Sequence, residues 1–201
     1  MDKLNQLLEL AKKENIDIHY LDIKDIGILG LYIKNEGLPP TIFLDTSIKN
    51  DKYKLIEVLS EELGHHFTSI GNSVNNINTY RSKLNIGKCE NKATKWATNF
   101  LVSEDDIIKV VNSNITCIYE MADKIGVPID ILMNKFEYLS KIKQMIDLKN
   151  GKYLILTNLP NLIIYNHIWF NYSFKNIKEM WYKISHLFYI KILYNNNSYI
   201  K

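Results

Sequence analysis

The feature that most constrains the fold of this chain is the spacing of apolar residues between positions 52 and 70. Apolar side chains recur there every three or four residues, at Leu55, Ile56, Leu59, Leu63, Phe67 and Ile70. At ~100° per residue they fall within roughly a third of a turn of a helix. Such a stripe is removed from water only by packing against other elements. The spacing therefore predicts a helix over residues 52–70 with one buried face.

The residues before this helix predict another helix and a small sheet. Residues 2–14 carry leucines and an alanine at helical spacing, which indicates an amphipathic helix. Three short stretches follow, at residues 16–23, 28–34 and 41–45, and they are rich in Ile, Leu and Tyr. Turn-forming Asp, Asn, Gly and Pro residues separate these stretches. We predict that the three stretches form a small antiparallel sheet.

The residues after the predicted helix over residues 52–70 predict further helices. Residues 88–102 show helical spacing, and the alanines among them suggest that another backbone passes close by. Ser103 resembles a helix N-cap, and the acidic residues after it open an all-helical extension over residues 104–145. Within the extension, residues 118–139 look superficially like a helix-turn-helix. Only Lys135 is basic in the second of these helices, which favours two helices that simply pack together.

The C-terminal part of the chain predicts a hairpin and a tail. Residues 152–157 and 161–165 flank a turn that contains proline, and such a pattern is typical of a hairpin. Residues 167–201 are rich in Asn, Ile, Tyr and Lys. Their apolar residues permit one amphipathic helix with a frayed end. We assign no function to this tail.

Composition and charge exclude several classes of protein. The chain has 201 residues, of which 46% are apolar, enough to bury a sizeable core. Twenty-five basic and 22 acidic residues leave a net charge of +3, which falls short of the footprint of a dedicated nucleic-acid binder. No apolar run approaches the ~18 residues that span a bilayer, and residues 1–6 do not resemble a signal peptide. Cys89 and Cys117 fit neither a disulfide framework nor a paired zinc motif. We expect a cytoplasmic protein with no membrane partner.

Potential metal ligands lie together on the predicted helix over residues 52–70. Glu61 and His65 are four residues apart and share a face roughly opposite the apolar stripe. A rigid helix fixes two such ligands at little entropic cost, although Glu and His on a helix surface are more often only solvated. Glu62 lies between this pair and the stripe, where its carboxylate can take a proton from an attacking water molecule. Gly64 costs ~1 kcal/mol in a helix interior, and a close backbone neighbour or substrate would explain it.

Two segments, residues 59–68 and 90–102, together form a pattern that is more specific than either segment alone. Residues 59–68, Leu-Ser-Glu-Glu-Leu-Gly-His-His-Phe-Thr, resemble the active-site helix of the ImmA/IrrE-type metallopeptidases, a family whose usual motif is HExxH. Residues 90–102 begin with a glutamate, carry an alanine three residues later and then a Trp-Ala pair, and are similar to the family's second helix. The order of the predicted elements also agrees with the family over about residues 1–145. We therefore expect an α+β fold in which a small antiparallel sheet packs on these two helices, followed by the all-helical extension and the C-terminal hairpin.

The resemblance implies roles for four residues. By position, His65 matches the family's second histidine ligand, Glu62 the general base and Glu90 the third, acidic ligand. Glu61 stands where the family motif has its first histidine. A carboxylate also binds zinc, so Glu61, His65 and Glu90 can still form a three-ligand Zn²⁺ site with an open fourth position. Two carboxylates neutralise the ion more fully than two imidazoles, so slower hydrolysis or a preference for another divalent metal is expected.

Alternatives to this assignment stay open on the sequence alone. In a shifted register Glu62 and His66, again four residues apart, are the ligands, and no acid stands where the base belongs. In a second alternative Glu61 marks a protein that has lost catalysis and acts by binding a repressor or another protein. DNA binding through residues 118–139 is disfavoured by the charge count.

The function that the resemblance implies is that of a zinc-dependent endopeptidase. Its protein substrate would be a helix-turn-helix transcriptional repressor of a phage or mobile element, and direct nucleic-acid binding is not expected. The chain then divides into a metallopeptidase-like core over residues 1–103 and a helical extension over residues 104–145. A C-terminal hairpin and amphipathic tail of unknown function occupy residues 146–201.

Overall fold

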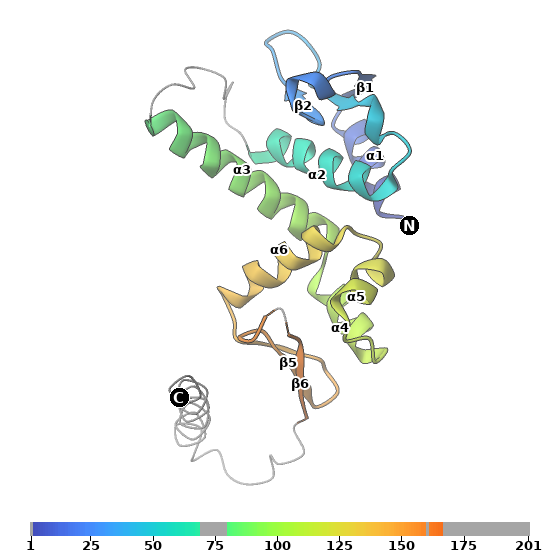
Figure 1. Ribbon diagram of the computed structural model, residues 1–201, viewed down its shortest axis with the longest axis vertical. Coiled ribbons are helices and arrows are strands. Elements are labelled where there is room, and N and C mark those ends of the chain that lie inside the picture. The colour runs from blue at the N-terminus through green and yellow to red at the C-terminus, as the bar shows by residue number, and fades with distance from the viewer. Residues whose placement is uncertain (1, 69–79, 160, 167–201) are drawn as a thin grey trace, which may run out of the picture. The chain divides into compact units, whose positions relative to one another are not determined.

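The computed structural model describes residues 2–68, 80–159 and 161–166, which belong to one compact unit ending at Asn166. In chain order its helices and strands are α1 (Lys3–Lys13), β1 (Asp17–Leu21), β2 (Gly30–Ile33), β3 (Thr41–Asp45), α2 (Lys52–Thr68), α3 (Tyr80–Leu101), α4 (Glu104–Asn112), α5 (Ile118–Ile125), α6 (Ile129–Ser140), β4 (Met145–Asp147), β5 (Lys152–Ile155) and β6 (Ile163–Asn166) (Figure 1). The predicted α+β class is confirmed. The predicted tail helix falls within residues 167–201, outside the described residues.

The first sheet has β3 in its middle and β1 and β2 at its edges. β2 and β3 are antiparallel as predicted, whereas β1 and β3 run parallel, so the sheet is mixed. The difference arises because β1 and β2 are not neighbours: the chain between them crosses from one edge to the other, and β3 then fills the gap. β3 takes the central place because its Ile42 and Leu44 are fully buried, whereas no residue of β1 is. The arrangement leaves β2 as an edge strand that faces α2.

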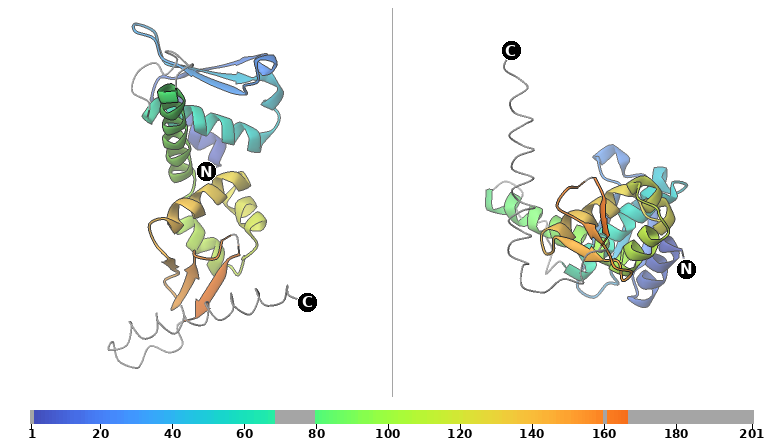
Figure 2. Two further views of the ribbon diagram at one scale, coloured as in Figure 1. Left: turned by 60° about the vertical axis from the view of Figure 1, so that its left-hand side comes forward. Right: turned by 90° about the horizontal axis from the view of Figure 1, so that it is seen from below.

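The central helix α2 packs against the sheet and against α1. Figure 2 shows, on its left, the sheet as a layer over α2. The first four residues of the predicted stripe are buried, which confirms that part of the prediction. Phe67 was predicted to be buried, but its side chain is 39% exposed. Its ring stacks on Trp96 with the ring centroids 4.7 Å apart. Ile70 lies outside the described residues.

Helix α3 crosses α2 at Gly64 and begins at Tyr80 rather than at the predicted residue 88. A Cβ atom added to Gly64 would lie 2.5 Å from the main-chain oxygen of Ala93 and 2.8 Å from its Cα. Main-chain atoms inside a packed helix cannot move aside as a flexible side chain can, so only glycine fits here. The expectation that a backbone passes close to Gly64 and to an alanine of the second helix is thus confirmed at Ala93. The contact brings the part of α3 around Ala93 close to α2.

The extension begins with a capping box at Ser103. Its hydroxyl accepts a hydrogen bond from the Asp106 N–H, and the Asp106 carboxylate accepts one from the Ser103 N–H. Residues 118–139 form the two packed helices α5 and α6, as predicted. Lys135 is only 6% exposed, and its Nζ donates to Asn99 Oδ1 at 2.7 Å. The single basic residue of α6 is therefore turned into the protein rather than toward a nucleic acid.

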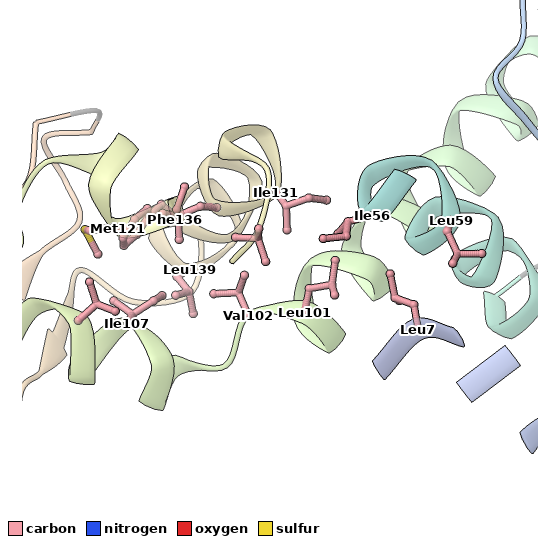
Figure 3. Packing of buried hydrophobic residues seen from close by; sticks show 14 of the residues in the cluster. Leu7, Ile56, Leu59, Leu101, Val102, Ile107, Met121, Ile131, Phe136 and Leu139 are labelled. Carbon is pink, nitrogen blue, oxygen red and sulfur yellow. The ribbon is translucent and has the colours of Figure 1, made fainter. Parts of the chain in front are cut away.

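A continuous cluster of buried side chains joins the first elements to the extension. In Figure 3 it runs from Leu7 and Leu59 through Leu101 and Val102 to Met121. The predicted hairpin is present as β5 and β6, and β4 adds a third antiparallel strand beside β5. The prediction of an all-helical chain to residue 145 was too long, because α6 ends at Ser140 and the three-residue β4 is too short to show a period. No helix among the described residues combines the length and the apolarity that a membrane crossing requires.

Candidate metal centre

Three predicted site residues converge where α2 and α3 meet. Glu61 and His65 come from one face of α2, and Glu90 comes from α3 across the Gly64 contact. One ligand atom of each residue lies within 4.8 Å of one ligand atom of each of the others. His65 Nε2 is 3.2 Å from Glu90 Oε2, with His65 mostly buried and Glu90 about half exposed. Within the described part of the chain this is the single group of His, Cys, Asp and Glu that is arranged to hold a metal ion.

The donor set and spacing of this group suit a divalent cation. Ligand atoms about 2.1 Å from a tetrahedral zinc ion lie about 3.4 Å from one another. One pair in the structure is already at 3.2 Å, and the rest lie within 4.8 Å. A shift of at most about 1.4 Å closes the difference, and the half-exposed side chain of Glu90 has room to move. Three protein ligands of nitrogen and oxygen also leave a fourth position for water or substrate.

Glu62 lies beside this group but does not point into it. Its carboxylate oxygen approaches Gly30 of β2, and the main-chain N–H of Tyr32 donates a hydrogen bond to the carboxylate. Burial, and next the charge of Glu61, raise the pKa of Glu62 to about 8, and the Tyr32 N–H opposes that shift. Burial, followed by the charge of Glu90, likewise raises the pKa of Glu61. The crowded carboxyl groups are thus hard to ionise together, and a bound cation would favour their ionised forms.

Without bound metal, Glu62→Gln should stabilise the fold at alkaline pH. The pKa of Glu62 is about 8 in the folded protein against an ordinary value of 4.5. Below pH 4.5 the carboxyl is protonated in both states, whereas between these values only the unfolded chain ionises, so the free energy of unfolding falls as pH rises. Glutamine does not titrate, so the variant should be more stable than the wild type by about 1–3 kcal/mol at pH 8 and similar near pH 4. Urea unfolding of both metal-free proteins at the two pH values tests this, and parallel pH profiles would contradict it.

Comparison with known proteins identifies the family. The family model described as the IrrE N-terminal-like domain, a peptidase family, matches residues 11–137. The chain belongs to this family. The predicted resemblance is therefore confirmed, and with it a metallopeptidase-type fold. No curated protein and no solved structure matches the chain.

This IrrE-like chain differs from the family's usual HExxH motif at Glu61, and the structure gives the consequence of that difference. The carboxylate of Glu61 converges with His65 and Glu90 as a histidine ligand would have to, so the first position of the motif still offers a ligand atom. The donor atom at this position is an oxygen, whereas a histidine would offer a nitrogen. Two of the three donors are now carboxylates, which favours harder divalent cations more than the usual set does.

His66 faces away from the three converging residues. The Tyr32 hydroxyl and His66 Nδ1 are 2.9 Å apart, and His66 Nε2 is 3.9 Å from Glu14 Oε2. Burial lowers the pKa of His66, which favours its neutral form. Both ring nitrogens therefore face other side chains. The shifted register, with Glu62 and His66 as ligands, would require both residues to turn away from the contacts they make with β2 and with Glu14.

Sequence reasoning missed three residues around the site of this IrrE-like protein. Gly30 and Tyr32 lie on the edge strand β2 beside Glu62, and Glu14 follows α1 and faces His66. Nothing in their local sequence connects them with the motif helix. The one available signal was Gly30 inside an otherwise apolar stretch, because a glycine in a strand often marks a close approach of other atoms.

Proposed function

We propose that this protein is a metal-dependent endopeptidase in which Glu61, His65 and Glu90 hold a zinc ion and Glu62 is the general base. The observation that carries the proposal is the convergence of the three ligand atoms within 4.8 Å, with Glu62 next to them on α2. Membership of a peptidase family supports the reaction class. The ligand geometry alone would fit other metal-dependent hydrolases, and membership of a peptidase family supports a peptide bond as the bond that is cleaved.

The chemistry follows from the donor set and from Glu62. When bound, the ion polarises the scissile carbonyl and makes a water molecule more acidic. Glu62 takes one proton from that water as its oxygen adds to the carbonyl carbon, and then gives the proton to the departing amide nitrogen. Glu62 must be ionised to begin. Burial is the largest cause of its raised pKa, and the charges of Glu61 and Glu90 add to it, so neutralisation of those charges lowers the pKa toward the value that a base needs.

For the substrate we propose a helix-turn-helix transcriptional repressor of a phage or mobile element. The resemblance of residues 59–68 and 90–102 to ImmA/IrrE-type enzymes is the support for it. Lys135, the single basic residue of α6, is buried, which supports the view that the protein does not itself bind DNA through α6. The protein is expected to act in the cytoplasm, where such repressors are found.

The test of this function uses repressors encoded near the gene as substrates. Metal-loaded protein is incubated with each repressor, and fragments are identified by mass spectrometry. We expect one repressor to be cut, the chelated protein to be inactive and re-addition of metal to restore cleavage. Cleavage that persists after complete removal of metal would contradict the proposal.

A catalytically impaired protein that binds its partner is the second candidate function. Glu61 favours this second function, because a second carboxylate among the ligands makes the metal ion a weaker Lewis acid. An ion held by two carboxylates and one imidazole polarises the substrate carbonyl less than one held by two imidazoles and one carboxylate. The retention of His65, Glu62 and Glu90 beside one another favours the enzyme. Tight binding of a repressor without cleavage, at one metal ion per chain, would support the second candidate.

Glu61→His should raise zinc affinity and the cleavage rate. The substitution restores a nitrogen donor at a position that already offers a ligand atom. It also removes one of the charges that raise the pKa of Glu62. We expect about a tenfold gain in zinc affinity, of the size that changes around metal ligands commonly produce. Competition with a chromophoric chelator measures it, with Glu57→His on the same helix as the control. A fall in both affinity and rate would mean that the site is adapted to its carboxylate.

A further inference from the structure

The edge strand β2 approaches Glu62 more closely than ordinary side-chain packing allows. A Cβ atom added to Gly30 would lie 2.6 Å from Glu62 Oε1 and 2.9 Å from its Cγ. Two residues along the strand, the main-chain N–H of Tyr32 donates to the same carboxylate. An edge strand has one row of N–H groups without partners in its sheet, so this donor is available. The direction of the Glu62 carboxylate therefore depends on the position of β2.

The side chain of Tyr32 ties β2 to two helices. Its hydroxyl is 2.9 Å from His66 Nδ1, and the two rings meet edge to face at 87° with centroids 5.5 Å apart. His66 Nε2 faces the Glu14 carboxylate at 3.9 Å. That carboxylate favours the tautomer with the proton on Nε2, so the phenol donates to Nδ1. The result is a chain of contacts from Tyr32 on β2 through His66 on α2 to Glu14 after α1.

We propose that Tyr32 is a positioning residue for Glu62, which it holds through its main-chain N–H while its hydroxyl, fixed by His66 and Glu14, keeps β2 in place. The inference rests on the proposed function, because it assigns Tyr32 to the same reaction. Tyr32 is not one of the three converging ligands. It acts through Glu62, and its main effect is on the direction of the carboxylate. Groups that orient a reacting side chain commonly change activity by about 10–100-fold.

Three single variants and one double variant of the full-length, metal-loaded protein test the proposal. Tyr32→Phe and His66→Leu each remove one end of the phenol–imidazole hydrogen bond, whereas His66→Asn keeps an acceptor near the place of Nδ1. We expect Tyr32→Phe and His66→Leu each to lower kcat about tenfold with KM and metal content unchanged. The double variant should lose no more than either single variant, because both remove the same bond. His66→Asn should retain most of the wild-type kcat.

A matched control and a second measurement keep the inference separate from the proposed function. Tyr53→Phe removes a phenol on α2 that donates to Asp123 at 3.3 Å, and it should leave kcat unchanged. Amide hydrogen exchange at position 32, measured by NMR, reports the N–H bond to Glu62 without any catalysis. We expect about tenfold faster exchange in His66→Leu and wild-type exchange in Tyr53→Phe.

The possible results distinguish the positioning role of Tyr32 from the proposed peptidase activity. If the wild type cleaves its substrate and the variants change neither kcat nor exchange at position 32, the positioning role is wrong and the enzyme remains. If no substrate is cleaved but exchange at position 32 rises in His66→Leu and Tyr32→Phe, the arrangement around Glu62 is correct and the peptidase assignment is wrong. Loss of kcat in His66→Asn equal to that in His66→Leu would also overturn the inference, because the acceptor would then not matter.

Discussion

Glu62→Gln is expected to lower the rate of peptide cleavage by at least about 100-fold, because general-base catalysis contributes roughly 10²–10⁴-fold. Glutamine has nearly the size of glutamate but accepts no proton. Metal content should stay at the wild-type level, because the three converging ligands are other residues. Steady-state cleavage, with metal analysis of the same samples, measures both quantities.

Glu57→Gln is the matched control for this substitution. It makes the same chemical change on the same helix, at a residue that pairs with Lys54 at 2.9 Å rather than with the site. We expect its cleavage rate to stay within about twofold of the wild type, since a partly exposed ion pair within one helix contributes little to stability and Glu57 is not one of the proposed ligands. Equal rates for Glu62→Gln and the wild type would remove Glu62 as the base and favour another proton acceptor. A loss of metal in Glu62→Gln would instead support the alternative in which Glu62 and His66 are the metal ligands.

Glu90→Ala is expected to weaken metal binding by more than about 100-fold, since even groups that only orient a ligand change metal affinity by about 10–100-fold. Glu90 is the one member of the group that comes from α3. Without it, Glu61 and His65 offer two ligands on a single helix, fewer than the three that zinc enzymes use. Competition with a chromophoric chelator gives the dissociation constant.

The fold should survive this change. The Glu90 side chain is about half exposed, so loss of its 3.2 Å pair with His65 should alter stability little. Glu137→Ala, at an exposed glutamate on α6 that pairs with Lys141, is the control and should bind metal like the wild type. Unchanged metal affinity in Glu90→Ala would exclude Glu90 as a ligand and leave the site without its contribution from α3.

The part of the site that the sequence predicted is the part fixed by local geometry. Residues four apart on a helix share a face in any helix, so the pairing of Glu61 with His65 required no tertiary information. Gly64 added a long-range clue, because a glycine in a helix interior needs a reason, and Ala93 of α3 supplies it. The placement of Glu90 opposite α2 follows from that close contact, which the alanines of α3 also indicated.

The parts that the sequence did not predict depend on how distant segments meet. The parallel pairing of β1 with β3 follows from strand order, and three similar extended stretches do not reveal their order. Phe67 fits the helical stripe by spacing, but near the end of α2 it is covered by the rings of Trp96 and His66 and keeps an exposed face. Tyr32 was not predicted as a site residue either. Its contacts with Glu62 and His66 join an edge strand to a helix about 30 residues later in the chain, and local sequence does not reveal such contacts.

The most direct test of the account is cleavage of the repressor in water enriched in ¹⁸O. Hydrolysis places one oxygen atom from water in the new C-terminal carboxylate, so mass spectrometry of the N-terminal fragment should show the mass of one ¹⁸O. We predict this label for the metal-loaded wild type, no new fragment for the chelated protein, and at most a trace of fragment for Glu62→Gln in the same time. An intact repressor after prolonged incubation with wild-type protein that holds one metal ion per chain would contradict the account.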